Sequence, residues 1–172
     1  LIGSDGGSSV VRKQLGISQE DLNYNRDWIV IDVELNEPDK LGDKLIQVCD
    51  KERLATFVPS HLPFRRWEFI IHEYEDKESF LDDKTIHELI AKWLQPEEYR
   101  IIRKAVYQFH SVIAKNFQKG NCFLIGDAAH QAPPFMGEGM MSGYRDAVNL
   151  SWKIAASIKN KLNTNLVDSY EI

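Results

Sequence analysis

Short apolar runs alternate with polar, turn-forming residues through the first half of the chain. The strand-like runs cover residues 28–35, 45–49, 55–59 and 67–74. Pro, Gly, Asp and Asn separate these runs, which is typical of antiparallel strands joined by short turns. Because residues 28–31 are all apolar, we expect this strand to be buried on both faces. The polar residues 17–27 predict a loop.

A helical periodicity follows these strands. In residues 83–94, apolar side chains recur at i, i+3, i+4 and i+7, namely at Ile86, Leu89, Ile90 and Trp93. Asp82 or Asp83 is suited to cap the start of this helix, and Pro96 follows its end. Residues 99–114 mix Ile, Val, Tyr and Phe with charged residues and predict another long strand.

The last third of the chain predicts a strand, a turn and a helix. Residues 123–125 form a short apolar run that ends at Gly126, which indicates a buried strand. A helix with a long apolar side is expected from Gly139 or Ser142 to Lys161. Between the strand and the helix lies a loop rich in Gly and Pro.

Both ends of the chain fall inside predicted elements. Residues 1–3 read as the end of a strand, and residues 170–172 read as the start of a helix. We therefore interpret the sequence as an internal piece of a longer protein.

Composition and charge narrow the function classes. The 172 residues are 43% hydrophobic and 27% charged, which is ordinary for a globular domain. A net charge of -5 with scattered basic residues argues against nucleic acid as a partner. No segment approaches the roughly 20 apolar residues of a membrane helix. Cys49 and Cys122 lack metal-binding spacing, so we expect no metal. Cys122 opens an apolar run, which predicts a buried free thiol there. A reducing cytoplasm fits this prediction.

The strongest candidate site begins where the strand at 123–125 ends. Its residues are Gly126-Asp127-Ala128-Ala129-His130, Pro133-Pro134, Gly137-Glu138-Gly139, Gly143 and Arg145-Asp146-Ala147. A carboxylate at a strand end, as at Asp127, accepts hydrogen bonds from sugar-type hydroxyls. Gly137 and Gly139 allow the backbone to approach a flat ligand closely. The N-terminus of the following helix suits a group that gains negative charge. The alternative is a loop that binds no ligand.

This string resembles the flavin-ribityl motif of the class A flavoprotein monooxygenases, the aromatic-hydroxylase family. The resemblance implies that Asp127 binds a ribityl hydroxyl, that Pro133 and Pro134 lie beside the isoalloxazine, and that the backbone of 137–141 contacts the pyrimidine edge. Many relatives have Asn where this chain has Met141, so a side-chain contact there is in doubt. A second stretch, Gly3-Ser4-Asp5-Gly6-Gly7-Ser8-Ser9-Val10-Val11-Arg12, is similar to the family's G-A-D-G-x-x-S-x-V-R motif, with Ser4 for Ala.

In the family, the residue matching Asp5 helps to hold the fold around the dinucleotide, and the residue matching Arg12 lies towards the flavin and the NAD(P)H approach. The cofactor-binding residues implied for FAD are therefore Asp5, Arg12, Gly126, Asp127, Ala128, Pro133, Pro134, Gly137, Glu138, Gly139, Met140 and Met141.

Three further stretches resemble one branch of the family, the 3-(3-hydroxyphenyl)propionate hydroxylases. They are Asp27–Leu35, Arg65–Phe69 and Ala105–His110. The resemblance implies an α+β fold, with an antiparallel substrate-domain sheet and helices at 25–114. Residues 1–24 and 115–172 would supply an incomplete Rossmann-like FAD-binding domain. It implies hydroxylation of a phenolic aromatic acid with NADH or NADPH and O2, and a possible homodimer.

The family's G-x-G-x-x-G unit, which binds the FAD pyrophosphate, does not occur in this sequence, and the family's C-terminal extension is absent. One alternative is therefore a non-catalytic piece without bound FAD. Another is a related flavin enzyme of halogenase or epoxidase type.

For three single residues, the sequence is compatible with more than one role. Arg66 suits a substrate carboxylate, but a surface or ion-pair role is an equal candidate. Tyr107 is expected either to face the substrate or to pack in the core, and His110 either to be a hydrogen-bonded core histidine or to contact the substrate. His130 is expected to fix the flavin loop by hydrogen bonding.

Overall fold

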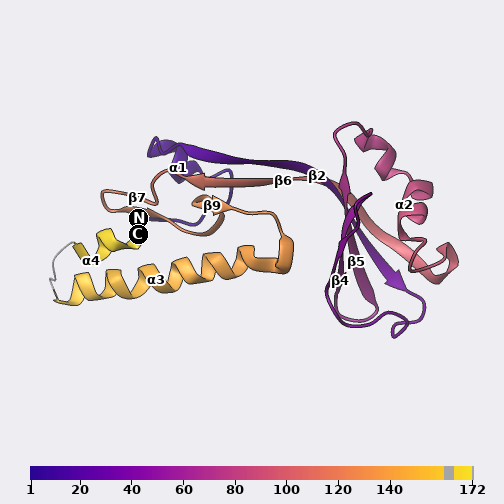
Figure 1. The fold of residues 1–172 in the computed structure, drawn as a ribbon. Coiled ribbons are helices and arrows are strands. Elements are labelled where there is room, and N and C mark those ends of the chain that lie inside the picture. The colour runs from indigo at the N-terminus through magenta and orange to yellow at the C-terminus, as the bar shows by residue number, and fades with distance from the viewer. Residues whose placement is uncertain (161–164, 172) are drawn as a thin grey trace. The chain divides into compact units, whose positions relative to one another are not determined.

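The computed structural model describes residues 1–160 and 165–171 and divides the chain into two compact units (Figure 1). One unit combines Leu1–Asn25 with Phe109–Ile172, and the other is the continuous segment Arg26–Gln108. The α+β class expected from the sequence is confirmed. The assignment of FAD binding to 1–24 and 115–172, and of substrate binding to 25–114, stays a prediction.

An antiparallel sheet forms the framework of the unit Arg26–Gln108. Its strands are β2 (Gln19–Leu35), β3 (Ile46–Cys49), β4 (Leu54–Pro59), β5 (Phe64–Ile71) and β6 (Tyr99–Ala114). A sixth strand, β9 (His130–Gln131), completes the sheet, and the strand order is β3-β4-β5-β2-β6-β9. β6 has the bounds that the sequence predicted, 99–114. The register places Glu68 of β5 between Val30 of β2 and Thr56 of β4.

One face of this sheet carries the core of the unit. Alternate residues of the second half of β2, namely Ile29, Ile31, Val33 and Leu35, pack there with Trp67 and with helix α2 (Asp83–Ile90). The Asp82 side chain accepts from Lys84 N at 3.2 Å and caps this helix as predicted. The helix ends at Ile90, earlier than the predicted 94, although Trp93 and Leu94 still contact the core. The short helices η1 (Lys77–Leu81) and η2 (Pro96–Glu98) flank α2 in sequence.

The loop predicted for residues 17–27 is wrong over most of its length, because β2 already begins at Gln19. Residues 20–23 are exposed and, apart from Leu22, polar, so this part of the strand lacks an apolar alternation. The apolar run 28–31 is buried on both faces, as expected.

The other unit joins the two ends of the chain in one small sheet. Strand β1 (Ile2–Gly3) pairs in parallel with β8 (Cys122–Leu124), and β7 (Gln118–Lys119) pairs with β8 on its other side. Ile2 lies opposite Phe123, and Gly3 lies opposite Leu124. This strand pairing brings the first and the last third of the sequence together.

The remaining elements of this unit are short except for one helix. They are α1 (Val10–Gln14), η3 (Gly126–Ala128), β9 (His130–Gln131), η4 (Phe135–Gly137), α3 (Glu138–Asn160), α4 (Asn165–Asp168) and η5 (Ser169–Glu171). Helix α3 begins one residue before the predicted Gly139, and its predicted end at Lys161 lies outside the described residues. Of the described helices, none is both long and apolar enough to cross a membrane. Both cysteines are free, and Cys122 is only half-buried rather than buried.

Candidate functional site

A sharp turn follows β8, and two glycines make it possible. Gly126 has φ +58°, a left-handed conformation that favours glycine. Gly143 of α3 lies directly against it, since a Cβ on Gly143 would come within 3.2 Å of Gly126 Cα. The turn and the helix are therefore in backbone contact.

Two polar bonds connect the same turn to α3. One carboxylate oxygen of Asp146, Oδ2, accepts from Gly126 N at 2.8 Å and lies 2.8 Å from His130 Nε2. The His130 ring also stacks on Phe117, with centroids 5.8 Å apart. The hydrogen bond expected for His130 is thus present, and its partner is Asp146.

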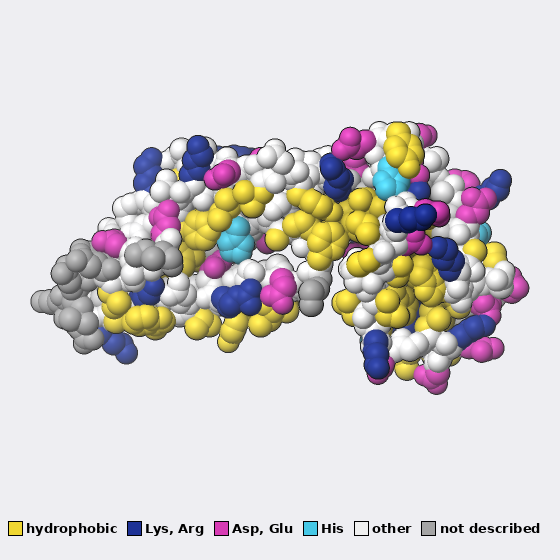
Figure 2. All heavy atoms as spheres, viewed as in Figure 1, with side chains coloured by type: hydrophobic (Ala, Val, Ile, Leu, Met, Phe, Trp, Pro, Cys, Tyr) yellow, Lys and Arg dark blue, Asp and Glu magenta, His cyan; other side chains and the backbone are white. Residues whose placement is uncertain are grey.

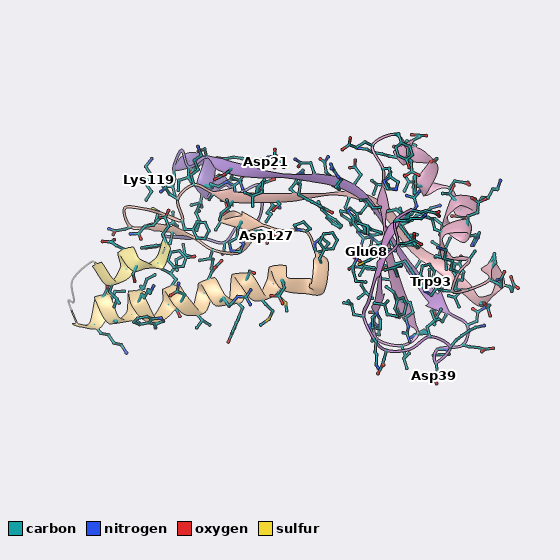
Figure 3. All side chains as sticks on the ribbon, in the orientation of Figure 1. Asp21, Asp39, Glu68, Trp93, Lys119 and Asp127 are labelled. Carbon is teal, nitrogen blue, oxygen red and sulfur yellow. The ribbon has the colours of Figure 1, made fainter. Side chains whose placement is uncertain are left out.

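The Asp127 side chain lies in this turn and is exposed (Figure 3). Across the described residues 1–160 and 165–171, no hydrogen bond or ion pair engages its carboxylate. The residues on either side of it, Gly126 and Ala128, are hydrogen-bonded to Asp146 and Arg12, whereas the Asp127 carboxylate is available to a ligand with hydroxyl groups.

The start of α3 offers open space beside backbone amides. Gly137 has φ +68°, and a Cβ on Gly137 or Gly139 would meet nothing within 4 Å. Met140 is 80% exposed and Met141 is 43% exposed. The first N–H groups of a helix have no partner within the helix and carry its positive dipole end. This end of α3 can accept a flat, electron-rich group.

Asp5 in the second motif serves as an acceptor within its own loop. Its carboxylate accepts from Ser9 Oγ at 2.5 Å, from Val10 N at 2.7 Å and from Val11 N at 3.1 Å. The Ser9 hydrogen bond, followed by the backbone bonds, lowers the pKa of Asp5. Asp5 therefore orders the start of α1, a role in holding the fold.

Arg12 joins the two motifs. Its guanidinium donates from Nη1 to Ala128 O at 2.8 Å and from Nη2 to Gly7 O at 2.7 Å. The residue is buried, with 4% of its surface exposed. The prediction that the two motifs meet is confirmed by these bonds and by the pairing of β1 with β8.

The three substrate candidates lie in different units. Arg66 and Tyr107 belong to Arg26–Gln108, and His110 belongs to the other unit. Arg66 is paired with Asp32 through Nε at 2.7 Å and Nη2 at 3.1 Å, and this hydrogen bonding raises the pKa of Arg66. The ion-pair role that the sequence left open is therefore present.

Tyr107 and His110 also have protein partners. Tyr107 is 38% exposed, and its hydroxyl contacts the guanidinium of Arg103. His110 Nδ1 lies 2.5 Å from Asn25 Oδ1 and is half-buried. A contact of either side chain with a substrate stays a prediction.

Two acidic residues were not singled out from the sequence. Asp146 appeared only as part of a helix-starting string, and its partner Gly126 lies 20 positions away in the sequence. Glu68 lies on β5 and is 8% exposed (Figure 3). Burial, more than the nearby Asp32, raises the pKa of Glu68, while Arg66 opposes the shift. An isolated Glu between apolar strand residues is the only sequence signal for such a site.

Comparisons with known proteins define the family. The model of the family described as FAD binding domain matches residues 1–172, and the chain belongs to this family. FAD is therefore the cofactor expected at this site.

Particular relatives are hydroxylases. The chain is 35% identical to a 3-(3-hydroxy-phenyl)propionate/3-hydroxycinnamic acid hydroxylase from Burkholderia cenocepacia (strain HI2424), over 99% of the chain and 31% of the relative. It is 38% identical to a protein of the same name from Mycobacterium sp. (strain JLS), over 100% of the chain and 30% of the relative. The chain thus spans about a third of the length of these relatives.

Solved structures show the same fold. Aklavinone-11 hydroxylase in complex with FAD and aklavinone superposes with a TM-score of 0.83 at 25% identity, over 99% of this chain and 33% of that one. A p-nitrophenol 4-monooxygenase from Pseudomonas putida DLL-E4 gives a TM-score of 0.83 at 23% identity, over 99% of this chain and 44% of that one. The second comparison supports the fold alone.

Proposed function

We propose that this chain holds the ribityl and isoalloxazine end of FAD in an FAD-dependent aromatic-ring hydroxylase. The observation that carries the proposal is the exposed Asp127 carboxylate, which is free of protein partners among the described residues and lies in a fixed turn between β8 and α3. Family membership and the names of the relatives support it.

The residues present fit a bound flavin. The open space at Gly137 and Gly139 leaves room for a flat ring beside the backbone, and Pro133 and Pro134 precede it as a half-buried wall. Asp127 would accept from a ribityl hydroxyl, and the backbone from Gly137 to Met141 would face the pyrimidine edge. When bound, FAD supplies the redox chemistry by which NADH or NADPH and O2 hydroxylate an aromatic ring.

The protein groups would act by orientation and electrostatics. The N-terminus of α3 favours negative charge, so it would stabilise the N1–C2=O edge when the flavin is reduced. Asp5 and Arg12 would act indirectly, because hydrogen bonds to the protein backbone already engage both side chains. No side chain is required here to form or break a covalent bond.

The substrate proposed is a phenolic aromatic acid such as 3-(3-hydroxyphenyl)propionate, in keeping with the names of the relatives. Arg66, Tyr107 and His110 are the proposed contacts, although Arg66 would have to share its guanidinium with Asp32.

A cytoplasmic location is proposed from the two free cysteines. A homodimer is proposed because Tyr144, Val148 and Trp152 form an exposed apolar stripe on α3; Figure 2 shows apolar side chains along this helix.

The test is Asp127→Ala in the full-length enzyme that contains this chain. The FAD dissociation constant should rise by about 10- to 150-fold, the equivalent of about 1.5–3 kcal/mol for a hydrogen bond to a charged group. Glu20→Ala, which removes an exposed carboxylate from β2 of the same unit, is the matched control and should leave the constant unchanged. An unchanged constant in Asp127→Ala would refute the proposed contact. Substrate-stimulated NAD(P)H oxidation with a panel of phenols would test the reaction.

A further inference from the structure

Asp146 binds the turn that carries Asp127 at two points. Its side chain is 17% exposed, and the Oδ2 atom accepts two hydrogen bonds from the turn, one from Gly126 N and one from His130 Nε2. Bonds to a carboxylate in a partly desolvated place are stronger than bonds between neutral groups. This carboxylate therefore fixes the backbone between Gly126 and His130 to α3.

The turn depends on such an acceptor. The last ladder bond of β8 on the β1 side runs from Ile125 N to Gly3 O at 3.0 Å. Gly126 N is the next amide, and its partner is the Asp146 carboxylate instead of a neighbouring strand. The turn then closes on itself through Ala129 N, which donates to Gly126 O at 2.8 Å. Asp127 lies between these fixed points.

His130 anchors the far end of the turn to the same oxygen. Its side chain is 22% exposed, and the ring is held on one side by Phe117 and at Nε2 by Asp146. Asp146 thus holds both ends of a segment whose only exposed carboxylate is Asp127. The helix that carries Asp146 is also the helix whose N-terminus would face the flavin.

We propose that Asp146 is a positioning residue for FAD: it acts through Asp127, by setting the distance between the Asp127 carboxylate and the N-terminus of α3. The proposal rests on the proposed function of Asp127. It assigns Asp146 no contact with FAD. Loss of Asp146 should therefore weaken FAD binding only where Asp127 is present to make its own bond.

A double-mutant cycle on the FAD dissociation constant tests this in the protein that binds FAD. Asp146→Ala should weaken binding by about 10-fold, and by less than about threefold when introduced into Asp127→Ala, since coupled residues lose additivity. A residue that only stabilises the fold would cause the same fold-loss in both backgrounds. Ser151→Ala, an exposed position on the same helix, should change the constant in neither background.

Conservative variants separate positioning from unfolding. Asp146→Asn keeps an oxygen acceptor for Gly126 N and should bind FAD within about threefold of the parent. His130→Phe keeps an aromatic ring against Phe117 but removes the bond to Asp146, and its smaller loss should also vanish in the Asp127→Ala background. If Asp146→Ala does not fold, His130→Phe decides the question through the same cycle.

The outcomes distinguish the two proposals. If Asp127→Ala leaves the FAD constant unchanged, the proposed function of Asp127 fails, and the inference fails with it. If Asp127→Ala weakens binding while the Asp146 and His130 losses are equal in both backgrounds, Asp127 stands and the positioning role is overturned. An Asp146→Ala protein that folds and binds FAD like the parent overturns it as well.

Discussion

Arg12 Nη1 donates to the carbonyl oxygen of Ala128 at 2.8 Å, across 116 positions of the sequence. The same guanidinium donates to Gly7 O at 2.7 Å. One buried cation thus satisfies a carbonyl in each of the two Gly-rich motifs. Charge-assisted bonds of this kind are stronger than neutral ones, and an orphaned buried carbonyl is costly.

Arg12→Met should therefore destabilise the protein. We expect a loss of about 2 kcal/mol or more in the free energy of unfolding, because two backbone carbonyls lose charged donors. Urea denaturation measures it. Lys13→Met, on the exposed side of the same short helix, is the control and should change stability by less than about 0.5 kcal/mol. Equal effects of the two substitutions would contradict a special role for Arg12.

The contact between Gly126 and Gly143 predicts a contrast between two glycines of α3. Gly143→Ala should lower the free energy of unfolding by roughly 1 kcal/mol, since its Cβ would press on a turn that Asp146 prevents from moving. Gly139→Ala meets open space and should be neutral or stabilising by up to about 1 kcal/mol through helix propensity. Thermal unfolding of both variants decides the point, and a stabilised Gly143→Ala would show that the turn can yield.

Burial of Glu68 predicts a pH-dependent effect of Glu68→Gln. The folded protein favours the protonated carboxyl, so its pKa is raised above that of the unfolded chain. The contribution of Glu68 to stability is therefore fully present below the unfolded pKa, near 4.5, and is lost as the pH rises through the raised folded pKa. Glu68→Gln, which never ionises, should gain stability relative to the parent as the pH rises.

The measurement is urea unfolding of parent and variant from pH 4 to pH 8. Glu78→Gln, at an exposed position in η1, controls for loss of a carboxylate in general. A difference between Glu68→Gln and parent that stays flat with pH, or that falls towards alkaline pH, contradicts the assignment.

The absence of G-x-G-x-x-G from these 172 residues predicts how the chain by itself binds flavins. Without a helix N-terminus for the pyrophosphate, the ADP half of FAD gains no dedicated contacts. The chain should purify colourless, fail to oxidise NAD(P)H and tend to self-associate. In a fluorescence titration, FAD and riboflavin should bind within about threefold of each other. A yellow, monomeric preparation with FAD bound far more tightly than riboflavin would contradict this.

The sequence predicted the elements that are determined by residues close together in the chain. The strand at 99–114 and the start of the helix after Asp82 follow from apolar periodicity and capping. The turn at Gly126 was expected because a glycine ends an apolar strand. These features need only neighbours in sequence.

Features that depend on distant partners were missed or left open. β2 begins at Gln19, but its first residues are mostly exposed and show no apolar alternation. The sequence alone therefore does not reveal where this strand starts. Arg66 could not be assigned from sequence, because Asp32 becomes its partner only through the register of β2 with β5. Asp146 is one of many acidic residues until Gly126 presents an amide to it.

The division of the chain also fixes an order of assembly during synthesis. The segment Arg26–Gln108 is continuous, so it leaves the ribosome with every partner it needs. Leu1–Asn25 is synthesised before it, yet the contacts of Ile2 with Phe123 and of Arg12 with Ala128 need residues that follow it. The interrupted unit can therefore complete these contacts only after the whole of Arg26–Gln108 has been synthesised.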